Sequence, residues 1–275
     1  NNLEFDHADI FEDLAAIQRQ FHHLVRCVPG EGMIVHPRGV TAIDDTLAMG
    51  CWTPTASFAI GAQTGADWRA ELRVADGSEF ILHREPDVAL DVSWQHCGRH
   101  NVENALTAVA AAHHVGVPAQ VAVEALEKFS GVKRRLELLG EVAGVAVYDD
   151  FAHHPTAIAT TLEGLRARTC RGRLIALVEP RSNTMRMGVH REKLAKATER
   201  ADRVYWFQPE GMEWSLDEVV DESPVPAELV GEIDELVERV AAEVQPGDQV
   251  VVMSNGGFAG VHHKLLAALE QGAAS

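Results

Sequence analysis

Short apolar segments alternate with amphipathic segments over the second half of the chain. A hairpin is expected at 135–150, where two apolar runs flank a Gly-containing turn. Further buried strands are expected at 173–180, 203–207 and 249–255, and helices at 155–168, 190–201, 232–244 and 257–271. Strands that alternate with helices indicate βαβ units around a largely parallel sheet. The Pro-containing segment 222–229 is expected to be a loop.

The first half mixes helices with a hairpin. A first helix is expected at 7–28, where apolar residues recur at helical spacing, namely Ile10, Leu14, Ile17, Phe21, Leu24 and Val28. A strand at 32–37, a hairpin at 68–85 and helices at 100–117 and 119–129 are expected to follow. The pattern changes at 131–135, so the sequence predicts an α/β chain in two parts, 1–135 and 136–275.

Composition narrows the class of protein. The 275 residues are 46% hydrophobic and 24% charged, which is typical of a soluble globular protein. The formal charge of −17 disfavours nucleic acid and anionic membranes as general partners. No apolar run approaches the length of a membrane span. Four widely separated cysteines are expected to be reduced, buried thiols of a cytoplasmic protein: Cys27, Cys51, Cys97 and Cys170.

Three polar clusters directly follow strands in the second half. They are "YDDFAHHP" at 148–155, "EPRSNTMRMG" at 179–188 and "MSNGGFAG" at 253–260. Because parallel strands with right-handed crossovers end at one edge of a sheet, these clusters should meet at that edge, where ligands bind. In the second cluster Arg181 and Arg186 flank "SNT", and a planar guanidinium matches a carboxylate through two hydrogen bonds. Ser254 and Asn255 can supply neutral donors and acceptors beside them.

Polar residues in the first half have both a structural and a functional interpretation. Glu4, Asp6, His7 and Asp9 stand before or at the start of the first helix, where acids stabilise a helix N-terminus. Glu4 can also bind a divalent cation whose other ligands are phosphates, as Mg²⁺ prefers. The histidine pairs at 22–23, 113–114 and 262–263 are expected to be ordinary helix residues.

Two further motifs concern a nucleotide. Asn101 and Asn104 lie one helical turn apart after His100, and their amides can bind the edge of a ring such as adenine. Helix capping by Asn101 explains the same residue equally well. The run Lys133–Arg134–Arg135 is either a solvated linker or a binding site for an anion such as phosphate.

These segments together resemble the Mur ligase family, the ATP-dependent amide-forming enzymes of bacterial peptidoglycan. "NLEFDHAD" is similar to the family segment with a magnesium-binding glutamate, and "RHNVENALTAVAAA" to the signature that lines adenine. "VKRRLE" resembles the step before the last domain. "YDDFAHHPTAI" is similar to the motif Asp-Asp-Tyr-x-His-His-Pro of the muramate–alanine ligase branch, with Phe151 in the tyrosine position.

The resemblance implies a fold, a reaction and substrates. The fold would be the remainder of a central ATPase domain at 1–135 and a Rossmann-like C-terminal domain with a mainly parallel sheet at 136–275. A carboxylate would attack the γ-phosphate of ATP, and an amine would attack the resulting acyl phosphate. The motifs lie nearest a murein-recycling branch that joins UDP-N-acetylmuramate to L-alanyl-γ-D-glutamyl-meso-diaminopimelate. The family's UDP-sugar domain and Walker-type phosphate loop have no counterpart in this sequence, so a fragment that does not ligate alone is expected.

The resemblance also implies roles for individual residues. Mg²⁺ would be bound by Glu4 and His23, with His22 as the near alternative. ATP would be bound by His100, Asn101, Asn104, Arg135 and Asp150. The incoming amine and the peptide would contact Phe151, His153, His154, Arg181, Asn183, Thr184, Arg186, Ser254 and Asn255. Direct participation in catalysis is expected of Glu4, His23, Arg135 and His153.

Three other functions stay open at this point. One is a UDP-N-acetylmuramate–L-alanine ligase. Another is a metal-dependent hydrolase that uses Glu4, Asp6, His7, Asp149, Asp150 and the histidine pairs, and it requires those ligands to converge on one metal. The third is a non-catalytic module that binds peptide through its second half. The sequence predicts no oligomeric state.

Overall fold

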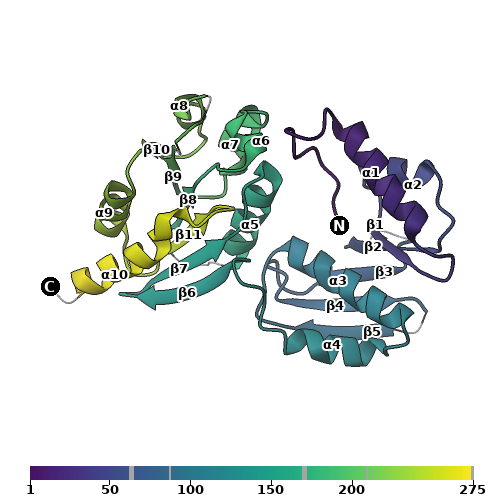
Figure 1. Ribbon diagram of the computed structural model, residues 1–275. Helices are drawn as coiled ribbons and strands as arrows, with labels where there is room; N and C mark the ends of the chain where they lie inside the picture. Colours follow the sequence, from purple (N-terminus) through teal and green to yellow (C-terminus); the bar gives the residue numbers. More distant parts are fainter. Residues whose placement is uncertain (62–64, 87, 169–171, 209, 213, 274–275) are drawn as a thin grey trace. The chain divides into compact units, whose positions relative to one another are not determined.

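The chain folds into two compact units, Asn1–Ser130 and Gly131–Ser275, in a computed structural model (Figure 1). The structure describes residues 1–275 except 62–64, 87, 169–171, 209, 213 and 274–275. Each unit has its own sheet and its own hydrophobic core. The run Lys133–Arg135 therefore belongs to the second unit.

The first unit is built on a five-stranded sheet in the order β1-β2-β3-β4-β5. β1, β2 and β3 are parallel, whereas β3, β4 and β5 are joined by antiparallel pairing. The strands are β1 Ile34–Pro37, β2 Thr55–Ile60, β3 Trp68–Leu72, β4 Glu79–Arg84 and β5 Val88–Ser93. The expected hairpin at 68–85 is therefore confirmed as β3 and β4. β2 and β5 were not expected.

Helices α3 and α4 cover one face of this sheet (Figure 1). Their apolar side chains, including Val102, Leu106 and Val123, pack with Phe58, Trp68, Phe80 and Leu82 of the strands. The helices of this unit are α1 Leu14–Cys27, α2 Thr41–Ala48, α3 Arg99–His114 and α4 Ala119–Glu127. The two sheet-covering helices lie where the sequence predicts them, whereas α2 was not expected.

The first helix is shorter than expected and its apolar stripe is partly exposed. Asp13 caps α1 by accepting the N–H of Ala16 at 2.6 Å, and residues 8–10 form a turn after His7, which has a φ of +54°. Ile10, Phe21 and Leu24 are 70%, 45% and 61% exposed. The expectation that 7–28 is one amphipathic helix is therefore wrong at its start, because Asp13 caps the helix at Leu14 and the acidic segment before it does not continue the helix.

The second unit is a six-stranded sheet in the order β10-β9-β8-β11-β7-β6, with only β6 antiparallel. Its strands are β6 Glu137–Val142, β7 Val145–Asp150, β8 Leu174–Val178, β9 Arg203–Phe207, β10 Ala227–Val230 and β11 Gln249–Met253. The mainly parallel sheet is confirmed. The expected loop at 222–229 is wrong in its last residues, because Ala227–Val230 pairs with β9 as an edge strand.

Helices cover both faces of the second sheet. α5 Pro155–Arg168 and α7 Arg191–Ala197 pack against side chains such as Leu174 and Val178. α9 Ile233–Glu243 and α10 Val261–Ala273 pack against the opposite set, which includes Ile175 and Leu177. Burial on both faces explains why these strands are continuous apolar runs. Short helices α6 Asn183–Arg186 and α8 Asp217–Asp221 were not expected, and a 3₁₀ turn, η1 Phe258–Gly260, precedes α10.

The burial of the cysteines and the length of the helices bear on two expectations drawn from composition. Cys97 is buried, Cys51 is half-buried and Cys27 is exposed, so the expected burial is wrong for Cys27, which lies on the outer side of the last turn of α1. Cys170 lies outside the described residues. Within the described part of the chain, no helix is both long enough and apolar enough to cross a membrane.

Candidate active site

Three strands of the second sheet bring the polar clusters together at their carboxyl ends. Met253 of β11 is the Cα partner of Asp150 of β7 on one side and of Val178 of β8 on the other. The chain leaves β7 and β8 toward the face covered by α5 and α7, but leaves β11 toward the opposite face, which α10 covers. This divergence is a topological switch point, where open α/β sheets bind ligands. The expected meeting of the three clusters is thus confirmed.

Asp150 is a buried carboxylate that holds the chain segments around it. Its Oδ2 accepts the N–H of Leu136 at 2.7 Å, and its Oδ1 accepts the N–H of Ala152 at 2.8 Å and the hydroxyl of Thr161 at 3.3 Å. Burial raises the pKa of Asp150, although these hydrogen bonds and the charge of Arg135 oppose the rise. The side chain therefore fixes the segment before β6 to the end of β7.

Asp149 and Arg134 form an ion pair beside it. Arg134 Nε lies 3.3 Å from Asp149 Oδ2, and the two side chains are 33% and 10% exposed. Arg134 also donates through Nη2 to the carbonyl oxygens of Ser254, at 2.6 Å, and Gly256. The cation run thus serves a structural purpose at Arg134, whereas the Arg135 side chain is exposed to solvent.

The aromatic position of the β7 cluster lies against both arginines. The guanidinium carbons of Arg134 and Arg135 lie 5.1 and 5.4 Å from the centre of the Phe151 ring, which is cation–π range. His153 packs edge-on to Phe151 with ring centres 5.4 Å apart, and its Nδ1 lies 3.0 Å from the Phe151 carbonyl. His154 instead contacts the ring of His190 at 4.5 Å. The two adjacent histidines therefore have different surroundings.

Ser254 connects the ends of β11 and β8. Its hydroxyl donates to the buried carboxylate of Glu179, and the N–H of Gly256 donates back to the Ser254 Oγ at 2.9 Å. The backbone N–H of Ser254 donates to the Asp150 carbonyl at 3.1 Å. Next to it, Asn255 Oδ1 is buried and accepts no hydrogen bond from the described residues. Buried acceptors without a donor are uncommon in folded proteins, which makes Asn255 a candidate for a group that a ligand completes.

Arg181 and Arg186 have different environments. A Cβ on Gly256 would lie 1.9 Å from Arg181 Nη1, so the guanidinium lies directly over this glycine while the side chain remains exposed. Arg186 Nη2 donates to the Glu210 carbonyl at 2.9 Å and so holds a neighbouring loop. Asn183 is exposed and Thr184 is buried. Of the two arginines, Arg181 is the one that lies against the β11 loop.

The expected metal ligands belong to the first unit. The Glu4 carboxylate is half-buried and accepts the Asn2 amide at 3.2 Å, and the neighbouring Leu3 is buried. His23 is exposed on α1, whereas His22 Nε2 lies 3.1 Å from the Gly50 carbonyl. The structure therefore gives His22 a structural contact and leaves the His23 ring on the surface. Two protein ligands suit Mg²⁺, which keeps several waters and binds phosphates.

The expected adenine residues open α3. His100 is half-buried, and a Cβ on Gly98 would lie 2.5 Å from its Cε1, so the ring requires a glycine at position 98. Asn101 lies inside the first turn of α3, whose N-cap is Gly98, and its side-chain amide donates to the Cys97 carbonyl at 2.7 Å. The capping interpretation of Asn101 is therefore wrong, because an N-cap side chain accepts a backbone N–H. The Asn104 Oδ1 accepts from the Asn1 side chain. The His100 ring packs directly against the backbone of Gly98, which restrains the orientation of the ring. A restrained ring of this kind suits a contact with the plane of a nucleotide base.

Two residues of the sheet edge carried no clear signal in the sequence. Glu179 is 7% exposed and pairs with a serine 75 positions away. His262 opens α10, and burial lowers its pKa, with Asp149 and Glu137 opposing the change and His263 and Arg134 adding to it. Glu179 follows an apolar strand, as many loop acids do, and His262 resembled an ordinary helix histidine. Only their interactions with residues far away in the sequence distinguish Glu179 and His262 from ordinary surface residues.

The metal-dependent hydrolase requires a cluster of ligands. Among the described residues, no group of three or more His, Cys, Asp or Glu side chains is arranged to hold a metal ion. Its expected ligands Asp149 and Asp150 are instead engaged with Arg134 and with backbone N–H groups.

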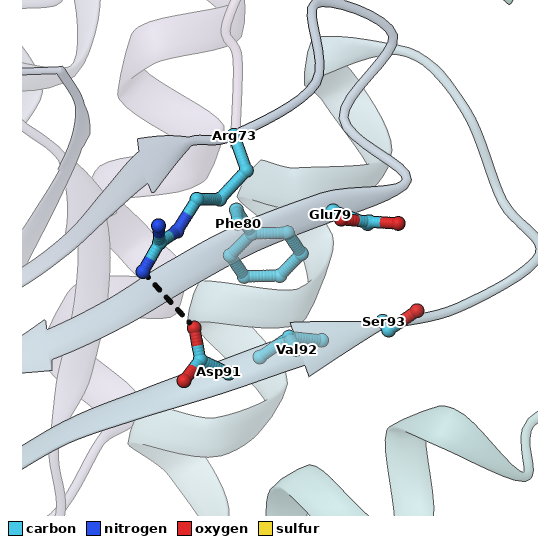
Figure 2. Close-up of a pocket in the computed structure, with 6 residues that line it drawn as sticks. All are labelled: Arg73, Glu79, Phe80, Asp91, Val92 and Ser93. Carbon is cyan, nitrogen blue, oxygen red and sulfur yellow. Dashed lines mark hydrogen bonds and ion pairs between the residues drawn. The ribbon is translucent and has the colours of Figure 1, made fainter.

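A shallow hollow of about 280 Å³ lies on the first unit at the ends of β4 and β5 (Figure 2). Figure 2 shows Arg73 reaching across Phe80 toward Asp91, and the two charged groups are 3.4 Å apart. Both side chains are largely exposed, so this pair contributes little to stability. The hollow contains no residue expected to bind substrate or cofactor. It is lined by Arg73, Glu79, Phe80, Asp91, Val92 and Ser93.

Comparison with known proteins supports the resemblance over nearly the whole chain. Residues 1–112 match the Mur ligase middle domain, and residues 134–256 match the Mur ligase glutamate ligase domain. The chain is 49% identical to the UDP-N-acetylmuramate–L-alanyl-γ-D-glutamyl-meso-2,6-diaminoheptandioate ligase of Escherichia coli over 97% of its own length. It is 32% identical to the UDP-N-acetylmuramate–L-alanine ligase of Acidothermus cellulolyticus over 93% of its length.

A solved structure has a similar fold. The crystal structure of a murein peptide ligase from Psychrobacter arcticus superposes with a TM-score of 0.71 and 44% identity, covering 94% of this chain and 56% of that one. The chain spans 58% of the length of the Escherichia coli relative and 56% of the Acidothermus one. The chain belongs to the Mur ligase family, and its two units correspond to the middle domain and the glutamate ligase domain of that family.

Proposed function

We propose that the protein is an ATP-dependent ligase that joins UDP-N-acetylmuramate to L-alanyl-γ-D-glutamyl-meso-diaminopimelate. The observation that carries this proposal is the 49% identity, over 97% of the chain, to a relative named for that reaction. Identity to the L-alanine ligase of Acidothermus cellulolyticus is lower, at 32%. The convergence of three polar loops at the carboxyl edge of the second sheet supports the same proposal, because it supplies a place for a substrate.

The two units would bind different substrates. The first unit would contribute to ATP and Mg²⁺ binding, and the second unit, which includes Arg135, would bind the peptide. Glu4 and His23 would hold Mg²⁺, which neutralises phosphate charge when bound. His100, Asn101, Asn104 and Arg135 would contact ATP. Arg135 is suited to phosphate, since the residue is exposed and its guanidinium is restrained by the Phe151 ring.

The structure suggests a modified role for Asp150. Both of its carboxylate oxygens already accept backbone N–H groups. We therefore assign it first to fixing Leu136 and Ala152, and through them the neighbouring Arg135, with any contact to the ATP ribose made through its remaining lone pairs.

The peptide would lie on the β7, β8 and β11 loops of the second unit. Arg181 would pair with a carboxylate, and Asn255 Oδ1 would accept from an amine, so that one end of meso-diaminopimelate meets complementary groups. Phe151, His153 and His154 would line the approach of the attacking amine, while Asn183, Thr184, Arg186 and Ser254 would shape the loops. Here the protein mainly orients the amine and excludes water.

The test is the substrate dependence of phosphate release by the intact protein. With ATP, Mg²⁺ and UDP-N-acetylmuramate present, the proposal predicts rapid phosphate release with the tripeptide and little with L-alanine. Preference for L-alanine would establish the alternative ligase. Metal-dependent hydrolysis without ATP would support the hydrolase. Tripeptide binding without phosphate release would support the non-catalytic module.

A further inference from the structure

Arg134 is held by contacts to several segments of the second unit. Its guanidinium pairs with Asp149 at 3.3 Å and lies 5.1 Å from the centre of the Phe151 ring. Its backbone N–H donates to Glu137 Oε2 at 2.8 Å, and its carbonyl accepts the N–H of Phe151 at 2.8 Å. The residue has a φ of +59°, a conformation that non-glycine residues rarely adopt. These contacts hold the arginine in this conformation.

The same guanidinium holds the turn after β11. Arg134 Nη2 donates to the carbonyl oxygens of Ser254 and Gly256, 120 and 122 positions away in the sequence. These two carbonyls flank Asn255, so a single side chain fixes the backbone on both sides of it. Ser254 is further held by the Asp150 carbonyl and by Glu179.

This turn carries Asn255 and lies against Arg181, and we assign both residues to the peptide. The buried Oδ1 of Asn255 has no donor among the described residues, and the backbone of Gly256 lies directly under the Arg181 guanidinium. We propose that Arg134 is a positioning residue for the peptide: it sets the 254–256 turn, and the turn places Asn255 and Arg181. This inference rests on the proposed function and adds to it a residue that does not itself touch substrate.

The chemistry of arginine suits this task. Nε can pair with Asp149 while Nη2 donates to two carbonyls, because the guanidinium is a rigid planar fork. A lysine can supply charge and one or two hydrogen bonds but not this geometry. A methionine keeps the length of the side chain and supplies no donor.

The test compares Arg134→Met and Arg134→Lys with Arg166→Met in the intact protein. Arg166 is a matched control because it also pairs with a carboxylate, that of Asp202, and donates to a backbone carbonyl, that of Arg200. Arg134→Met should raise the KM for tripeptide by roughly ten-fold or more, with the KM for ATP nearly unchanged. Arg134→Lys should recover part of the loss, and Arg166→Met should alter neither KM.

Hydrogen exchange supplies a readout that does not depend on turnover. Backbone amides in 253–258 should lose protection in Arg134→Lys and Arg134→Met, and should keep it in Arg166→Met. Unchanged protection, or an equal rise in both KM values, would overturn the positioning role. Inactivity of the wild-type protein toward tripeptide would instead refute the proposed function and leave the exchange result to decide on Arg134.

Discussion

The carboxylate of Asp150 accepts the backbone N–H of Leu136 at 2.7 Å and so joins the segment before β6 to the end of β7. Leu136 has a φ of +52°, and Arg134 two residues before it has a φ of +59°. A buried acid thus holds a segment of unusual backbone conformation, and this segment carries Arg135, the proposed phosphate ligand.

Asp150→Asn should destabilise the second unit by about 1–3 kcal/mol, because the amide cannot accept from both backbone donors and one N–H is left unpaired. Burial raises the pKa of Asp150 above 3.8, so the folded protein binds a proton at pH values where the unfolded chain has released it. The free energy of unfolding should therefore contain a component that falls as pH rises from 3.8 through the raised pKa.

Urea titrations of wild type and Asp150→Asn at a series of pH values check both effects. The difference between the two proteins should be largest at low pH and should shrink as the pH passes through the raised pKa. A difference that grows with pH would show that the folded state favours the charged carboxylate, contrary to this account.

Gly256→Ala should impair peptide binding without harming the fold. A Cβ at this position would lie 1.9 Å from Arg181 Nη1, so the guanidinium has to move, which a long exposed side chain can do. Gly257→Ala is the matched control, since nothing lies within 4 Å of a Cβ there. We expect the KM for tripeptide to rise by roughly ten-fold for Gly256→Ala alone. Steady-state kinetics and thermal unfolding of both variants measure these effects. An equal KM for tripeptide in the two alanine variants would argue against a role for the contact between Arg181 and Gly256.

Substitutions of the two adjacent histidines of α1 should distinguish a structural role at His22 from a metal-binding role at His23. His22→Ala loses a contact to the Gly50 carbonyl and should cost about 0.5–1.5 kcal/mol of stability. His23→Ala and Glu4→Gln should be nearly neutral for stability but raise the Mg²⁺ concentration that half-saturates turnover. Denaturant unfolding and magnesium titrations of the rate measure the two effects. A shift in magnesium dependence with His22→Ala and none with His23→Ala would exchange the two assignments.

The sequence predicts the sheet edge well because strand ends are local signals. Asp150, Val178 and Met253 each end an apolar run, and parallel pairing then brings them together. The hydrogen bond of Glu179 with Ser254, and the bonds of Arg134 to Ser254 and Gly256, depend on residues 75 to 122 positions apart and leave no local pattern. Periodicity likewise predicted an amphipathic helix at 7–28, but Phe21 and Leu24 of its apolar stripe are exposed, because periodicity shows which residues share a face and not what covers that face.

The claim that the carboxyl edge of the second sheet binds the peptide is tested most directly by Arg181→Ala in the intact enzyme. Losing a charge-assisted pair to a substrate carboxylate should raise the KM for tripeptide by about ten-fold or more, with the KM for ATP little changed. Arg186→Ala is the matched control, because Arg186 donates to the Glu210 carbonyl, and it should change the tripeptide KM far less. An equal loss for tripeptide and ATP with Arg181→Ala, or an unchanged KM for tripeptide, would contradict the account.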